Sequence, residues 1–303
     1  MTPDNLLFVS QYQKRLKVHP EITSSSGYFN SPELNDQINQ QVLEFDDRVL
    51  TSMHFHQFPF GLDQELISGL VIDHTVNRLA ELGAYPEILR FSFVKNKHLA
   101  KSDLMRLMAK MRDYATQYNI SVIFEDVLNA DSEFPEWIIC ASAVGAVHLK
   151  SNLNSRRIIK GDKVIVSGAI GAHGLAMKNL HADLEDQYEL PFDNYAVHRQ
   201  IATLLHDFGG LIKFIKMPFD GVNSAFSAIS QVTDLKLELF QSKVPVLDTT
   251  KHVAMLNDLN PVDLDNEGAF LCVVGQQKAH EVVNKLKTQH HGRSATIIGE
   301  VTV

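Results

Sequence analysis

Three glycines between an apolar run and a helix-like segment form the motif with the clearest chemical potential. Gly168, Gly171 and Gly174 lie within VSGAIGAHGLAM, residues 166–177. A glycine turn that leads into a helix leaves backbone N–H groups free at the helix N-terminus, where they can bind a phosphate or another anion. The spacing matches neither of the common phosphate loops, G-x-x-x-x-G-K-[ST] and G-x-G-x-x-G. Two interpretations stay open: an anion site, or a tight turn that packs a helix against a strand.

Histidines offer a second candidate site. His54 and His56 alternate in MHFH and share one face of a strand, and His74 follows on the next helix. Two imidazoles at positions i and i+2, with a third from elsewhere, can bind zinc or another transition metal. The alternative is three ordinary exposed or hydrogen-bonded histidines.

Alternating strand-like and helix-like segments must position these residues. Period-two apolar patterns and apolar runs predict strands, whereas apolar residues at a spacing of three and four predict helices. The predicted strands cover residues 48–55, 87–94, 120–124, 136–148, 163–168, 210–217, 235–240, 268–275 and 294–301. The main predicted helices cover residues 62–82, 101–118, 221–232 and 279–287.

This order of segments predicts an α+β protein of two domains. Residues 1–30 carry few periodic signals and are interpreted as an N-terminal arm. The polar, turn-rich stretch SNLNSRRIIKGD marks a boundary, which gives an N-terminal domain over residues 31–155 and a C-terminal domain over 156–303.

Composition excludes several classes of protein. The net charge of −8 opposes a general affinity for nucleic acid or for an anionic membrane, and neither is expected as a partner. No apolar run approaches the roughly 20 residues that span a bilayer, and the N-terminus lacks the features of a signal peptide. Cys140 and Cys272 lie in apolar runs without metal-ligand spacing, so each is expected to be a buried thiol. We therefore expect a cytoplasmic protein.

Several segments resemble one known family in the same order along the chain. KGDKVIVSGAIGAHGLAM is similar to the G-D-x-V-I-V-S-G-x-I-G-x-H-G segment of the HypE family of hydrogenase maturation proteins, which belong to the AIR-synthase-related ATP-binding proteins. HTVNRLAELGAYPEILRFSF, LDNEGAFLCVV and ATIIGEV resemble further segments of that family. The resemblance spans residues 34–301, nearly the whole chain.

The resemblance implies a two-domain AIR-synthase-like fold. Its N-terminal α/β domain would have a sheet that pairs across a homodimer, and its C-terminal domain would be an α/β sandwich. Family members bind ATP with a divalent metal, so ATP and Mg²⁺ are the implied cofactors. Other hydrogenase maturation proteins are the implied partners.

The family's functional positions can be matched to this chain one by one. The resemblance implies cofactor-binding roles for Asp36, Asn77, Asp126, Gly168, Gly171, His173, Asp220 and Gly221. It implies metal-binding roles for Asp126 and for Asp63, the latter only if a short insertion is assumed. No catalytic residue is assigned.

At other positions the chain departs from the family pattern. Met53, Arg78 and Met217 stand where the family has carboxylates. A thioether does not bind Mg²⁺, and an arginine repels a metal ion but can meet a phosphate or another anion directly. The family also ends in a reactive cysteine, whereas this sequence ends in IIGEVTV.

These departures predict an altered HypE-like protein whose metal–ATP site is degraded. Its expected role is accessory, in [NiFe]-hydrogenase maturation or a related ATP-linked process. One alternative is an active ATP-dependent enzyme with a metal site rearranged around Asp36, Asp63, Asp126 and Asp220. Another is a binding module for an anion or a transition metal.

Overall fold

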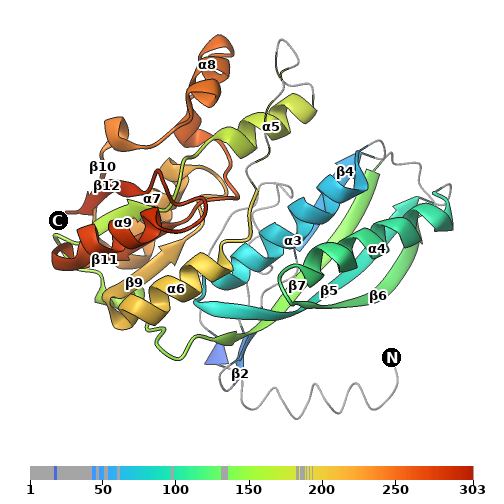
Figure 1. The fold of residues 1–303 in the computed structure, drawn as a ribbon, viewed down its shortest axis with the longest axis horizontal. Coiled ribbons are helices and arrows are strands. Elements are labelled where there is room, and N and C mark those ends of the chain that lie inside the picture. The colour runs from blue at the N-terminus through green and yellow to red at the C-terminus, as the bar shows by residue number, and fades with distance from the viewer. Residues whose placement is uncertain are drawn as a thin grey trace.

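The computed structural model describes residues 17–18, 43–45, 48–50, 54–59, 62–96, 99–130, 136–181, 184, 188, 190, 192 and 194–302. These residues form two units, each made of one sheet and its helices, which lie side by side in Figure 1. We call these units the first and the second layer. Within the described part of the chain, no helix combines the length and apolar character needed to cross a membrane.

The first layer is built on a seven-stranded sheet. Its strand order is β1-β2-β3-β7-β5-β6, and β4 pairs with β7 as well. Only β5 and β6 are parallel; the other pairs are antiparallel. The bounds are β1 (Lys17–Val18), β2 (Leu43–Phe45), β3 (Arg48–Leu50), β4 (His54–Pro59), β5 (Ala84–Asn96), β6 (Ser121–Ala130) and β7 (Glu136–Val147). The predicted strand at 48–55 overlaps β3 and the start of β4, and its residues 51–53 lie outside the described residues.

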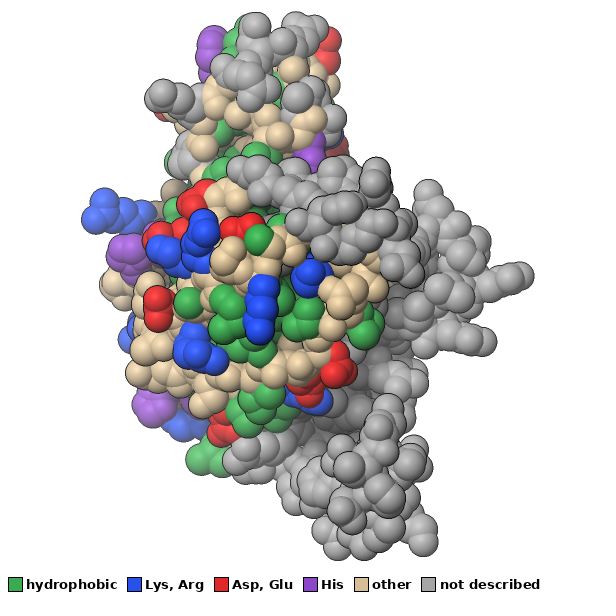
Figure 2. All heavy atoms as spheres, turned by 90° about the vertical axis from the view of Figure 1, so that its right-hand side faces the viewer, with side chains coloured by type: hydrophobic (Ala, Val, Ile, Leu, Met, Phe, Trp, Pro, Cys, Tyr) green, Lys and Arg blue, Asp and Glu red, His purple; other side chains and the backbone are tan. Residues whose placement is uncertain are grey.

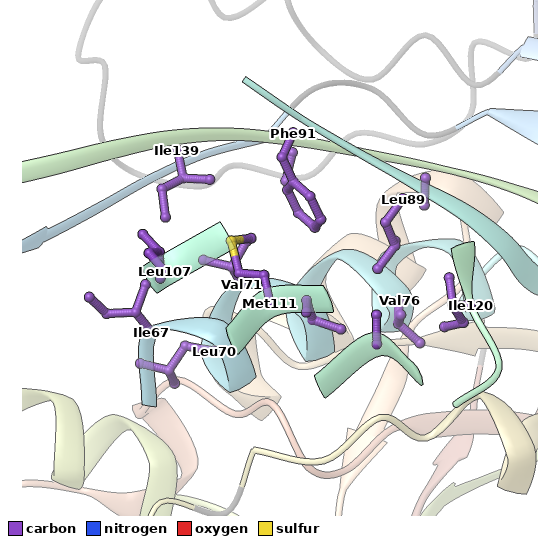
Figure 3. Packing of buried hydrophobic residues seen from close by; sticks show 14 of the residues in the cluster. Ile67, Leu70, Val71, Val76, Leu89, Phe91, Leu107, Met111, Ile120 and Ile139 are labelled. Carbon is purple, nitrogen blue, oxygen red and sulfur yellow. The ribbon is translucent and has the colours of Figure 1, made fainter. Parts of the chain in front are cut away.

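Helices α3 (Gln64–Ala80) and α4 (Lys101–Thr116) cover one face of this sheet. Their apolar side chains meet those of β5 and β7 in a continuous core, shown in Figure 3. In Figure 3 Val71 and Val76 of α3 lie on the side of the helix that faces β5. Ile67 lies next to Leu107 of α4, and all four side chains are buried. The burial of these side chains supplies most of the favourable free energy of the layer. Helix α3 is thereby held firmly, together with the polar residues on its other face.

The second layer is built on a five-stranded antiparallel sheet of order β10-β12-β8-β11-β9. The strands are β8 (Lys163–Val166), β9 (Ile212–Lys216), β10 (Leu237–Leu239), β11 (Leu271–Val274) and β12 (Thr296–Val301). The helices are α5 (Ala172–Leu180), α6 (His198–Phe208), α7 (Val222–Thr233), α8 (Asp248–Leu256) and α9 (Ala279–Lys287). Short 3-10 helices are η2 (Ser155–Arg157), η3 (Gly209–Leu211), η4 (Gln241–Lys243), η5 (Pro261–Asp263) and η6 (Gln276–Lys278).

Both faces of the second sheet are buried. Val164 and Val166 of β8 pack in a core with residues of α7, whereas Ile165 packs on the opposite side with residues of α6 and α9. This alternation follows from the period of two along a strand. The predicted α/β sandwich is therefore confirmed. Cys140 and Cys272 are buried free thiols, as predicted.

Helix α6 joins the two layers, because it contacts α3 and β5 of the first and α9 of the second. The first sheet ends at Val147 and the second begins at Lys163, on either side of the predicted domain boundary. The domain limits themselves stay predictions, and most of the predicted arm at 1–30 lies outside the described residues.

Candidate functional site

A group of imidazoles lies between β4 and α3, where the two layers meet. His54 and His56 point to the same face of β4, since they are two residues apart on a strand. Their rings lie 5.4 and 5.1 Å from the ring of His74 on α3, measured between centroids. Arg78 lies one helical turn after His74. Its guanidinium covers the ring of Phe219, 4.2 Å from the centroid. The three histidines that the sequence offered as a candidate metal site therefore lie close together.

A carboxylate from the second layer completes this group. Glu267 forms a hydrogen bond with Nδ1 of His74, although 193 residues separate them. Nε of Arg78 donates to Nε2 of His74 at 3.4 Å. Nε2 must therefore carry the lone pair, so Nδ1 carries the proton that it donates to Glu267. We call His54, His56, His74, Arg78 and Glu267 the histidine centre.

The histidine centre shifts the proton affinities of its members. Desolvation lowers the pKa of His54, His56 and His74 well below the ordinary value, and the cation of Arg78 lowers each further. Desolvation raises the pKa of Glu267 to about 7, against the opposing effects of His173 and Arg78. The imidazoles are thus neutral at pH 7. Several shifted pKa values within one cluster of side chains are typical of functional sites.

Two exposed carboxyl groups, those of Asp220 and Asp265, interact electrostatically with members of the histidine centre. The pKa of Asp265 is raised to about 6 by desolvation and by the charges of Asp220 and Glu267. The pKa of Asp220 is also raised by desolvation, although Arg78 and Lys216 act in the opposite direction.

The centre does not form a metal site among the described residues. No group of three His, Cys, Asp or Glu side chains in the described ranges could hold a metal ion. For His74 the reason is visible, because Glu267 and Arg78 engage both ring nitrogens. Arg78 also places a fixed positive charge beside the imidazoles, which opposes a metal cation.

Asn77, a predicted cofactor-binding residue, is fully buried beside this centre. Its amide donates to the carbonyl oxygens of Tyr195 (2.8 Å) and Glu267 (2.7 Å), and its oxygen accepts from the Val197 N–H (2.8 Å). The side chain therefore joins α3 to two segments of the second half of the chain.

The glycine stretch forms a turn before α5, with Gly171 at φ +87° as the N-cap residue. Its N–H donates to the side-chain oxygen of Asn266 (2.6 Å), and the N–H of Gly174 donates to the carbonyl of Asp265 (2.9 Å). Two of the N–H groups that an anion would need are thus engaged by the 265–266 segment. A Cβ on Gly174 would lie 2.6 Å from the Asp265 nitrogen, so close packing requires glycine there.

The other predicted residues of this half lie around the same region. Gly168 is buried, and a Cβ there would lie 3.0 Å from the carbonyl oxygen of His291. His173 is buried in the first turn of α5. Desolvation lowers the pKa of its imidazole, and the charge of Glu267 acts in the opposite direction. Gly221 has φ +88° and precedes α7, next to the exposed Asp220.

The predicted metal ligands lie on separate elements. Asp63 is exposed and caps α3 by accepting from the N–H of Glu65 at 3.3 Å. Asp126 is exposed on β6, at the edge of the first sheet. Asp36 and Met53 lie outside the described residues. The assigned roles of all these residues stay predictions.

Sequence reasoning missed Glu267 and its neighbour Asn266. The signal was present, since LDNEG was one of the segments that carried the resemblance. A buried glutamate in that segment could not be placed opposite His74 without the fold, because nothing local links the two positions.

Comparisons with known proteins agree with this fold. Residues 160–303 match the C-terminal domain of AIR-synthase-related proteins. A putative hydrogenase expression/formation protein of Methanocaldococcus jannaschii is 25% identical over 284 residues, which are 93% of this chain and 84% of that protein. The carbamoyl dehydratase HypE of Bradyrhizobium diazoefficiens is 26% identical over 254 residues, 83% of this chain and 73% of that protein.

Solved structures of other proteins share this fold. A HypE–HypF complex matches with a TM-score of 0.76 and 23% identity over 90% of each chain. HypE in complex with ATP matches with a TM-score of 0.73 and 20% identity, over 100% of this chain and 87% of that one. The chain is therefore HypE-like in sequence and in fold, and its C-terminal half is an AIR-synthase-related domain.

Proposed function

We propose that this protein acts in hydrogenase maturation as a HypE-like accessory protein in which metal-dependent ATP chemistry is reduced or lost. The observation that carries the proposal is the position of Arg78. Its side chain donates to His74 and its guanidinium covers the ring of Phe219, at a position where the family resemblance calls for a carboxylate. The names of the relatives support the maturation role.

The remaining carboxylates support reduced metal chemistry. Mg²⁺ requires oxygen ligands that converge at about 2 Å in near-octahedral geometry. Asp63 is used as a helix cap and Asp126 lies on an edge strand, so the two belong to separate elements. Met217, another replaced carboxylate, is buried and offers no oxygen ligand.

Calorimetric titration with ATP, with and without Mg²⁺, tests the proposal. We expect weak binding at most and no gain from Mg²⁺. Asp126→Ala should change neither binding nor any nucleotide turnover, like the matched control Asp113→Ala, which alters another exposed aspartate of the same layer. Strong Mg²⁺-dependent binding that Asp126→Ala abolishes would instead favour an active enzyme with a rearranged metal site.

A homodimer formed through the first sheet is the second part of the proposal. Strand β6 is an edge strand, and its register pairs Ile123 with Arg90 and Leu128 with Val94. These positions alternate with core residues of β5, so both side chains lie on the face opposite α3 and α4. They are 45% and 60% exposed. Figure 2 views the side of the molecule where β6 ends and α4 begins, and it shows hydrophobic side chains gathered there among Lys and Arg.

An exposed edge strand with apolar side chains is prone to pair with another chain. Light scattering should therefore give the mass of a dimer, and Ile123→Glu should shift it toward the monomer. Met255→Glu alters an even more exposed apolar side chain, on α8, and should leave the mass unchanged. A monomeric wild-type protein at micromolar concentration would refute this part.

A further inference from the structure

Apolar and basic side chains, all exposed except the half-buried Arg157, lie along the connection between the two sheets and on the adjoining η3. The linker strip consists of Leu149, Lys150, Arg157, Ile159, Lys160 and Leu211. Leu149 is 97% exposed, Ile159 60% and Leu211 44%. Single exposed apolar residues are normal, but apolar side chains grouped with cations mark interaction surfaces.

The two segments of the strip lie side by side. A Cβ on Gly209 would lie 3.2 Å from the Cβ of Lys150, and Nζ of Lys150 donates to the carbonyl of His206 at 2.7 Å. The guanidinium of Arg157 donates to the carbonyl oxygens of Asn152 and Gly210. Leu149 and Leu211, which adjoin Lys150 and Gly210, therefore belong to one surface held by hydrogen bonds.

The charge of this surface contrasts with that of the whole protein. Residues 148–163 contain five Lys and Arg but one acidic residue, Asp162, in a chain of net charge −8. Both carboxylate oxygens of Asp162 are held by Nζ of Lys213 at 2.7 Å. The neighbouring Asp207 is paired with Lys285 at 2.6 Å. The strip is thus a local positive surface.

We propose that the linker strip binds an acidic amphipathic segment of a partner protein. Its cations would attract glutamate and aspartate side chains, and the three apolar side chains would contact leucine-like residues of the same segment. A nucleic acid would use the cations but not the apolar side chains. An anionic membrane would be opposed by the net charge of the rest of the molecule. The inference is independent of nucleotide binding and so goes beyond the proposed function.

Fluorescence anisotropy with defined probes tests this inference on the full chain. The probe is a labelled peptide of alternating leucine and glutamate, compared with a glutamate–serine peptide and a leucine–lysine peptide of the same length. The variant Leu149→Asp/Lys160→Glu changes two exposed positions. The control Met255→Asp/Lys251→Glu makes the same changes on the exposed surface of α8. Equal melting temperatures of both variants and the wild type verify folding.

We expect the leucine–glutamate peptide to bind best, with an affinity that falls as salt is raised from about 50 to 500 mM. The strip variant should bind at least about tenfold more weakly, whereas the control should stay within about twofold of the wild type. Equal binding of the glutamate–serine peptide would overturn the apolar part of the inference. The partner class would be wrong if duplex DNA or phosphatidylserine vesicles bound more tightly and lost that binding in the strip variant. Absence of peptide binding would overturn the whole inference.

Discussion

Replacing Asn77 by alanine should destabilise the protein more than any exposed substitution on α3, because this side chain joins the two halves of the chain. The change removes the hydrogen bonds that Asn77 makes with the carbonyls of Tyr195 and Glu267 and with the N–H of Val197. Asn77 is fully buried, so water cannot replace the lost amide without entering the core. Each buried group that loses its hydrogen bond to Asn77 costs about 1–3 kcal/mol, so the free energy of unfolding should fall by about 3–9 kcal/mol for the three groups.

Thermal and guanidinium unfolding measure this loss. Circular dichroism measures the loss of secondary structure in both layers, and the fluorescence of the single tryptophan, Trp137, gives a second unfolding signal. For a protein of this size 1 kcal/mol corresponds to about 2–4 °C, so the melting temperature should fall by at least about 6 °C. Both probes should shift, because the lost bonds connect the two layers.

Asn223→Ala is the matched control. Asn223 is exposed on α7 and makes one side-chain hydrogen bond, to Asp263 at 2.6 Å. Its loss should cost less than about 1 kcal/mol, since water can satisfy the groups left behind. If the Asn77 variant were no less stable than this control, the role given to Asn77 as a joint between the halves would be refuted.

Three further substitutions follow from buried contacts. Nζ of Lys216 donates to Oε1 of Glu81 at 2.8 Å, and both side chains are buried. Lys216→Met removes this ion-pair partner of Glu81 and should lower the free energy of unfolding, measured with denaturant, by about 3–5 kcal/mol. Gly174→Ala places a methyl group 2.6 Å from the nitrogen of Asp265 and should lower the free energy of unfolding by about 1–3 kcal/mol. Burial lowers the pKa of His198 to about 4, so the unfolded chain binds this proton more readily. Stability should therefore be full above pH 6.5 and fall by about 3 kcal/mol as the pH drops to 4, a loss that His198→Phe should reduce in pH-dependent melting curves.

Each of these variants has a control in the same chain. Lys163→Met removes the partner of Glu300 in a pair that is more exposed, so a loss as large as that at the buried pair would contradict the burial argument. Gly275→Ala adds a methyl group that meets nothing within 4 Å, and it should leave stability nearly unchanged. His252 is exposed on α8, and its replacement by phenylalanine should leave the pH dependence as it is. An identical pH dependence in the His198 variant would refute the assignment.

Local patterns in the sequence determined most of the secondary structure. The apolar spacing near the C-terminus predicts a helix at 279–287, and α9 covers the same residues. The alternation in KVIV predicts a strand, and β8 presents its side chains to two different cores.

The contacts that the glycine stretch makes depend on the tertiary structure. The spacing of its glycines determined that a turn would precede a helix, and both interpretations required that turn. Asn266, which lies 95 residues further along the chain, accepts the N–H of Gly171 and so engages a group that an anion would need. The spacing of the glycines carries no information about this contact.

The histidine centre shows the same division. Periodicity alone placed His54 and His56 on one face of a strand and put His74 and Arg78 one turn apart on a helix. The contact between His74 and Glu267 exists only because the second layer packs against α3. Repeating patterns reflect local backbone geometry, which acts over a few residues. The meeting of a buried imidazole and a carboxylate depends on how two separately folded layers fit together, and only the tertiary structure determines that.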